Sequence, residues 1–146
     1  MSDSLFPAET QSAAETMALG RAFGRALQPG DVVALYGDLG AGKTHFVKGV
    51  AMARGVAEED VSSPTFALVQ LYDEAAGADL PLAHVDAYRL ERPEQFVDIG
   101  GIELMDGEGV VLIEWPERVE DLLPAYTIRL KLTHAGDDRR RIERLG

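Results

Sequence analysis

Residues 37–44 bring glycines, a lysine and a threonine together at a spacing that can do chemistry. They read Gly-Asp-Leu-Gly-Ala-Gly-Lys-Thr, which fits the pattern G-x-x-x-x-G-K-[S/T]. Glycines let the backbone approach an anion closely and aim several N–H groups into one concavity. Lys43 can neutralise β- and γ-phosphate oxygens, and Thr44 can offer its hydroxyl to Mg²⁺, which prefers oxygen ligands. We therefore expect a phosphate-binding loop, with these residues around the nucleotide: Asp38, Leu39, Gly40, Ala41, Gly42, Lys43 and Thr44.

The segments on either side of this loop fit the same interpretation. Residues 31–36 form a short apolar run typical of a buried strand. Residues 44–54 carry apolar side chains at helical spacing, and Gly55 follows where a helix would end. Strand, loop and helix thus come in the order that phosphate binding needs, because the positive end of the helix then faces the anion. Asp38 is expected to cap the loop rather than to meet the attacking group.

A phosphate loop also needs an acid for its Mg²⁺, and this acid usually ends an apolar strand next to the loop strand. Two residues fit: Glu114 follows four consecutive apolar residues, and Asp86 follows a less uniform run. We favour Glu114 as the metal ligand and Asp86 as the group that orients or deprotonates the attacking water. The two roles are exchangeable on the sequence alone. Thr65 lies after the loop helix, where it can donate to a phosphate oxygen or ligate Mg²⁺.

Composition bounds the class of protein. The 146 residues predict a single domain, 1–146, with a real core, and there is no cysteine for disulfides or thiolate metal sites. No signal peptide and no apolar run of about 20 residues are present, so we expect a cytoplasmic protein with no membrane partner. The net charge of −11 disfavours direct binding of RNA or DNA, because such affinity depends on neutralising phosphates. The chain contains no asparagine and so no guanine-reading Asn-Lys-x-Asp, which favours ATP over GTP.

The remaining patterns predict an α/β sandwich whose sheet mixes parallel and antiparallel strands. The expected elements are a helix over 12–27 opened by a capping box, a hairpin of strands 66–72 and 80–86, a short helix over 93–98, a buried strand over 110–113, one or two helical turns over 117–123, and strands over 126–132 and 140–145. His84 and His45 are expected to be packing or surface residues rather than ligands. Trp115 is expected either in the core or beside the site.

Four motifs in this order resemble the bacterial TsaE family, formerly YjeE. They are Gly37–Thr44, Ser63-Pro64-Thr65-Phe66, His84-Val85-Asp86-Ala87-Tyr88-Arg89-Leu90 and Ile113-Glu114-Trp115, and the resemblance covers nearly the whole chain. Two positions differ from the family's common pattern: Ala87 stands where leucine is frequent, and His45 where a second threonine is frequent.

The resemblance implies a three-layer P-loop NTPase sandwich and an ATPase that acts in making N6-threonylcarbamoyladenosine (t6A) in tRNA. It implies TsaB and TsaD as partners, with tRNA met only indirectly through their complex. The family's residue roles would carry over as follows: Lys43 on phosphate, Thr44 and Glu114 on Mg²⁺, Asp86 near the reacting phosphate, Thr65 as a switch-like residue and Trp115 near the nucleotide.

Two other functions share the loop. A small-molecule kinase would need an acceptor pocket and usually an arginine-bearing lid, for which Arg89 and Arg92 are candidates. A non-hydrolytic switch would bind ATP and a partner without needing turnover. Because the loop itself contains no arginine, we expect an ATPase to be slow alone and to be completed by its partner, with Arg89 the nearest candidate in the chain.

Overall fold

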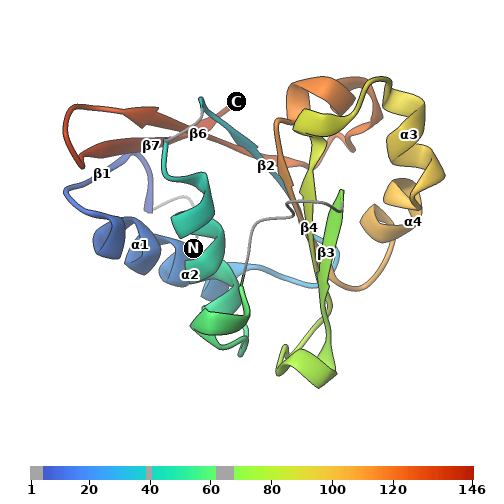
Figure 1. Ribbon diagram of the computed structural model, residues 1–146, viewed down its shortest axis with the longest axis horizontal. Coiled ribbons are helices and arrows are strands. Elements are labelled where there is room, and N and C mark those ends of the chain that lie inside the picture. Colours follow the sequence, from blue (N-terminus) through green and yellow to red (C-terminus); the bar gives the residue numbers. More distant parts are fainter. Residues whose placement is uncertain (1–4, 39–40, 62–67) are drawn as a thin grey trace.

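The computed structural model describes residues 5–38, 41–61 and 68–146, which build one seven-stranded sheet with helices on both faces (Figure 1). The strands are β1 (Ala8–Thr10), β2 (Val32–Tyr36), β3 (Val69–Tyr72), β4 (Leu82–Asp86), β5 (Val110–Glu114), β6 (Ile128–His134) and β7 (Arg140–Leu145). The α-helices are α1 (Ala13–Ala26), α2 (Lys43–Ala53), α3 (Pro93–Asp98) and α4 (Gly101–Met105). Short 3₁₀ segments are η2 (Glu58–Asp60), η3 (Glu74–Ala76), η4 (Ala87–Arg89) and η5 (Pro116–Leu122).

The sheet is parallel at its centre and antiparallel at its sides. Its order is β1-β7-β6-β2-β5-β4-β3, in which β6, β2, β5 and β4 are parallel neighbours. Strands β1, β7 and β3 each join antiparallel. The central strands β2 and β5 read as continuous apolar runs because helices cover them on both faces, and their residues are almost all buried. The predicted mixed sheet and the hairpin that contains β3 and β4 are confirmed.

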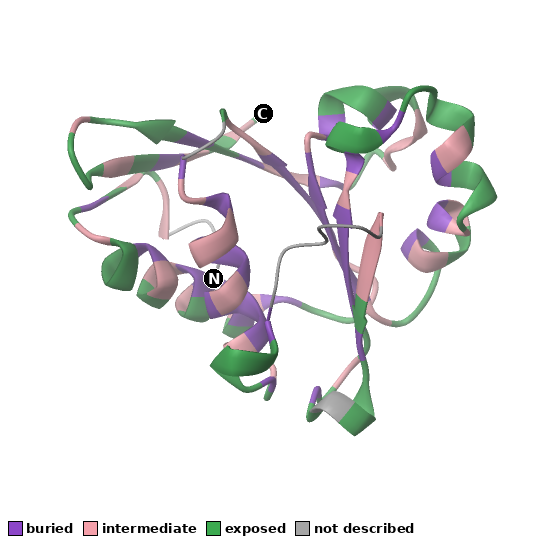
Figure 2. Ribbon diagram, viewed as in Figure 1, coloured by how far each residue is buried: buried purple, intermediate pink, exposed green. Residues whose placement is uncertain are grey.

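Alternate residues of the central strands pack into two separate cores. Val33, Leu35 and Leu112 face α1 and α2, whereas Val32, Val111 and Ile113 face α3, α4 and η5. Figure 2 shows the buried residues on the central strands and on the sides of the helices that face them. The result is the expected three-layer sandwich. No helix within the described residues has the length and apolar character needed to cross a membrane.

Glycines set the distance between α1 and the helix that follows the loop. A Cβ on Gly20 would overlap the carbonyl oxygen of Phe46, and one on Gly49 would overlap that of Met17. Ser12 caps the N-terminus of α1, and its hydroxyl accepts from the N–H of Glu15 at 3.1 Å. The side chain of Glu15 accepts from Gln11 N–H rather than from Ser12 N–H, so the predicted capping box is displaced by one residue at its second bond.

Several sequence-based bounds were wrong. Strand β1 was not predicted, because three residues are too few to show a period. Helix α4 was not predicted and starts at Gly101, directly after Gly100, whose φ of +86° makes the turn between α3 and α4. Strand β6 runs from 128 to 134 rather than from 126 to 132, so its alternation was recognised but its ends were not.

The close helix packing predicts a loss of stability in Gly49→Ala. The new methyl group has backbone rather than a flexible side chain in its way, so the helices must move apart, at a cost of about 1–3 kcal/mol. Urea unfolding should show this loss. Gly107→Ala is the matched control, because its Cβ would lie 3.3 Å from the oxygen of Leu104, and it should change stability much less. Equal stability of the two variants would contradict the packing argument.

Candidate nucleotide-binding site

The loop begins where β2 ends, and glycine is needed at both of its ends. Gly37 has φ +144°, and a Cβ there would meet the carbonyl oxygen of Leu132 on β6. Gly42 has φ +94° and forms the left-handed residue before α2. Between them the N–H of Ala41 donates to the carbonyl of Asp38 at 3.1 Å. Leu39 and Gly40, two of the predicted nucleotide-binding residues, lie outside the residues that the structure describes.

Lys43 is the first residue of α2 and its side chain is buried, with 5% of the residue exposed. Its Nζ donates to the carbonyl oxygen of Gly37 at 2.5 Å and lies 3.9 Å from the centroid of the Trp115 ring. Burial lowers the pKa of Lys43 from its ordinary value, because an ammonium loses its hydration there. The lysine is thus a buried cation at the N-terminus of a helix, where anions bind favourably.

Acidic side chains surround this cation. The negative charges of Glu114, Glu117, Asp86 and Asp38, in decreasing order of effect, raise the pKa of Lys43 and partly oppose the effect of its burial. Glu114 is itself buried, with 8% exposed. The loop lysine and the two predicted acids are therefore brought into one electrostatic cluster.

Strand register places the two acids level with the start of the loop. Leu35 on β2 pairs with Glu114 on β5, and Glu114 pairs with Asp86 on β4. Both acids end parallel strands, so they lie at the carboxyl edge of the sheet, where ligands bind in such folds. Asp86 also has a local task, because its Oδ1 accepts from Tyr88 N–H at 3.0 Å and caps η4.

Trp115 follows Glu114 in the chain and its ring lies beside the loop lysine. It has φ +56° and ψ +50°, a left-handed conformation that is unusual for a large aromatic residue and is often found at functional sites. Its ring packs against Tyr88 at 5.0 Å between centroids, and Lys43 lies against it. Trp115 packs against the second core, and its ring also lies beside Lys43.

The contact between His84 and Glu114 was not predicted from the sequence. The ring of His84 is buried, as a packing role predicts, but Nε2 lies 2.5 Å from Oε2 of Glu114. The position of His84 two residues before Asp86, in the same strand and on the same face, was the signal that could have indicated this contact.

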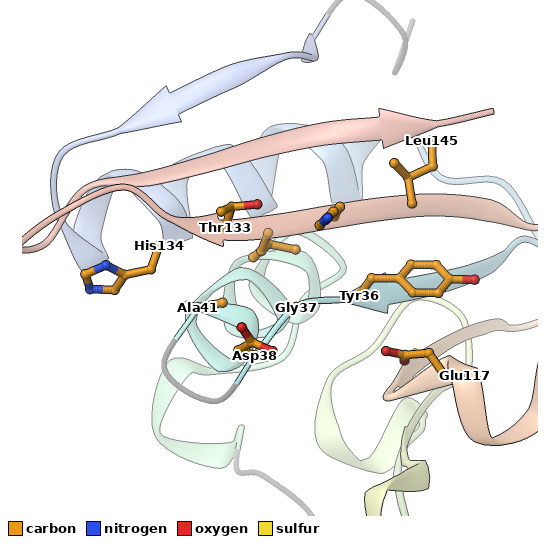
Figure 3. Close-up of a pocket in the computed structure, with 10 residues that line it drawn as sticks. Tyr36, Gly37, Asp38, Ala41, Glu117, Thr133, His134 and Leu145 are labelled. Carbon is orange, nitrogen blue, oxygen red and sulfur yellow. The ribbon is translucent and has the colours of Figure 1, made fainter.

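A cavity of about 520 Å³ opens on the other side of β2 (Figure 3). Gly37, Asp38 and Ala41 of the loop line it, together with Tyr36, Glu117, Lys131, Leu132, Thr133, His134 and Leu145. The hydroxyl of Tyr36 donates to Glu120 at 2.6 Å and accepts from Arg129 Nε at 3.2 Å. These bonds tie η5 to β2 and β6 at the wall of the cavity.

The metal-binding capacity of the described residues is limited. They contain no group of three His, Asp or Glu side chains arranged to hold a metal ion. Mg²⁺ commonly takes only one or two protein carboxylates and completes its shell with phosphate and water, so Glu114 and the hydroxyl of Thr44 fit this ion when a nucleotide is bound. Thr65 lies outside the described residues.

The strand, the glycine loop, the buried lysine opening α2 and the mixed three-layer sandwich define a P-loop nucleotide-binding protein. The family profile described as "Threonylcarbamoyl adenosine biosynthesis protein TsaE" matches residues 10–142. The chain therefore belongs to the TsaE family, which acts in t6A biosynthesis.

Individual relatives agree with this assignment. The chain is 46% identical to the "tRNA threonylcarbamoyladenosine biosynthesis protein TsaE" of Treponema pallidum over 133 residues, which are 91% of this chain and 95% of that protein. It is 41% identical to the TsaE of Bacillus subtilis over 128 residues, 88% and 77% of the two chains. The crystal structure of Bacillus subtilis YdiB superposes with a TM-score of 0.73 at 34% identity, covering 94% of this chain and 82% of YdiB.

The surroundings of Tyr36 at the cavity wall predict that its hydroxyl loses its proton only at unusually high pH. Burial, and then the hydrogen bond to Glu120, raise the pKa of Tyr36 from 10.0 to about 12. Because the folded state holds this proton more tightly, the stabilisation is complete below pH 10 and is lost as the pH rises through 12. Absorbance at 295 nm should show a last phenolate near pH 12 that is absent in Tyr36→Phe. The difference in unfolding free energy between the two proteins should shrink above pH 10; a constant difference would contradict the prediction.

Proposed function

We propose that residues 1–146 form one P-loop ATPase domain that binds and hydrolyses ATP with Mg²⁺ in t6A synthesis. Membership of the TsaE family supports the pathway. The observation that carries the ATPase proposal is the buried Lys43 at the start of α2, facing the carboxylates of Glu114 and Asp86. A lysine whose charge is disfavoured by burial gains strongly from a bound polyanion, and a nearby carboxylate supplies a ligand for the Mg²⁺ that accompanies such an anion.

Each predicted residue has a task in this proposal. Lys43 and backbone N–H groups of the loop bind the phosphates, and Thr44 and Glu114 hold Mg²⁺. The ion, when bound, neutralises charge on the phosphate oxygens. Asp86 orients the attacking water and accepts its proton, and Thr65 contacts the reacting phosphate.

The cavity beside β6 is the proposed binding site of the nucleoside. The metal-side acids lie on β5 and β4, on one side of the loop strand, and the cavity lies on the other side. A nucleotide whose terminal phosphate points toward Glu114 must direct its base the opposite way. Tyr36 and Leu145 line that space from β2 and β7.

Hydrolysis by the isolated protein should be slow. Arg118 donates to the carbonyl of Leu90 at 3.0 Å and lies over the Tyr88 ring, so it is used in holding η4. Arg89, the nearest candidate in the sequence, is exposed. We propose that TsaD and TsaB complete the site and that tRNA is reached only through their complex, in keeping with a net charge of −11.

Loss of the loop lysine should abolish tight nucleotide binding. Lys43→Ala removes charge-assisted bonds to phosphate, and the affinity for ATP with Mg²⁺ should fall roughly 10- to 100-fold. Calorimetry measures it, and tryptophan emission, which comes from Trp115 alone, should change on binding because the ring lies against Lys43. Lys48→Ala, in the same helix but outside the site, is the control. Absence of binding to the wild-type protein, with TsaB and TsaD added, would refute the proposed function.

Asp86→Asn should separate binding from turnover. An asparagine oxygen can still accept from Tyr88 N–H, so η4 stays capped while the base is lost. ATP affinity should stay within a few-fold, and partner-stimulated hydrolysis should fall about 100-fold or more. Asp98→Asn, exposed at the end of α3, should have no effect. If Asp86→Asn binds ATP, fails to hydrolyse it and still supports normal tRNA modification, a switch that needs no hydrolysis replaces the ATPase.

A further inference from the structure

His84 is a buried polar residue that the proposed roles leave unused. Strand alternation puts Leu82, His84 and Asp86 on the face of β4 that looks toward α2, the face from which Glu114 also projects. His84 is 1% exposed. A ring in this position could be replaced by an aliphatic side chain if packing were its only task.

The contact between His84 and Glu114 joins the neighbouring strands β4 and β5 diagonally. His84 pairs with Leu112 and Asp86 pairs with Glu114, so the imidazole reaches two residues toward the carboxyl end of β5. Nε2 lies 2.5 Å from Oε2, so a hydrogen bond joins two side chains that are only 2% and 10% exposed. A carboxylate that binds a metal ion only accepts hydrogen bonds, so in the proposed site Nε2 is the donor.

The other ring nitrogen has no task among the described residues. Nδ1 of His84 is buried and makes no hydrogen bond to any of them. The polar role of the ring is therefore the bond to Glu114. That bond fixes Oε2, and with it the rotation of the carboxylate, and leaves Oε1 for a cation or a metal-bound water.

We propose that His84 is a positioning residue that holds the Glu114 carboxylate in the orientation needed for Mg²⁺. The inference rests on the proposed function, because it gives Glu114 the metal. The inference distinguishes two contributions to ATP affinity, the binding of phosphate and the gain provided by Mg²⁺. Lys43 and the loop bind phosphate without His84, whereas the gain in affinity that Mg²⁺ provides depends on it. Partners one step removed from a metal commonly contribute 10- to 100-fold in metal affinity.

Two amide substitutions of His84, which differ in side-chain length by one methylene group, test whether the hydrogen bond to Glu114 matters for Mg²⁺. In His84→Gln the amide nitrogen falls close to the position of Nε2 and can still donate to Glu114. In His84→Asn it falls close to Nδ1 and cannot. Calorimetry on the full chain measures ATP affinity in EDTA and across a Mg²⁺ titration, with unfolding temperatures recorded for both variants.

We expect the variants to differ in ATP binding with Mg²⁺ but not in EDTA. ATP affinity in EDTA should match the wild type for both variants. The Mg²⁺ concentration for half-maximal effect should rise about tenfold or more in His84→Asn and stay within about threefold in His84→Gln. With TsaB and TsaD present, His84→Asn should lower kcat at low Mg²⁺, with recovery at high Mg²⁺. Thr127→Val, which removes a hydroxyl that donates to the Pro124 carbonyl at 2.7 Å away from the site, should leave all of these values unchanged.

An NMR measurement on the wild-type protein tests the same inference and does not depend on the folding of a variant. In the wild-type protein the imidazole ¹⁵N signal of His84 Nε2 should shift when Mg²⁺ joins the ATP complex, because its carboxylate partner then meets a cation. Equal Mg²⁺ dependence in His84→Asn and His84→Gln would overturn the inference, as would an unmoved Nε2 signal. Failure of the proposed function is distinguishable, since the wild type would then show no gain in ATP affinity from Mg²⁺ at all.

Discussion

The site depends on one constraint, the parallel pairing of β2 with β5 in a fixed register. Leu35 lies opposite Glu114, so the strand that leads into the loop and the strand that ends in the acid finish level with each other. Both strands are buried on both faces, and a slip of one residue would turn Glu114 to the other face of the sheet. The packing of two apolar cores thus determines where Lys43 and the carboxylates meet.

The polar groups at this meeting point are expensive to bury. An ammonium and a carboxylate both lose hydration there, and the protein offsets the loss with specific contacts: Gly37 O and the Trp115 ring for Lys43, and His84 for Glu114. The left-handed backbone of Trp115 adds strain. A fold optimised only for stability would place apolar residues here, so the cluster is best explained by a ligand that compensates these costs.

What the sequence predicted well was local. The loop pattern, the apolar run before Glu114 and the alternation in β6 each come from neighbouring residues; the apolar run forms β5 as predicted, and the alternation forms β6 two residues later than predicted. The His84–Glu114 bond joins residues 30 apart through a register that no local pattern carries. The start of α4 was missed for a related reason: glycines signal an interruption, but only the fold decides whether a new helix follows. Sequence thus identified the groups that could do chemistry more readily than the contacts that orient them.

The segment after Glu114 links the two sides of the loop strand. At one end, Trp115 lies against Lys43; further along η5, Glu120 is bonded to Tyr36 and to Arg129, at the cavity wall. A polyanion on Lys43 competes with the ring for the same ammonium. Between these two ends, Arg118 donates to the carbonyl of Leu90 and lies over the Tyr88 ring, so the segment also packs against η4. The segment from Trp115 to Glu120 therefore contacts both the loop lysine and the residues at the cavity wall on the opposite side of β2.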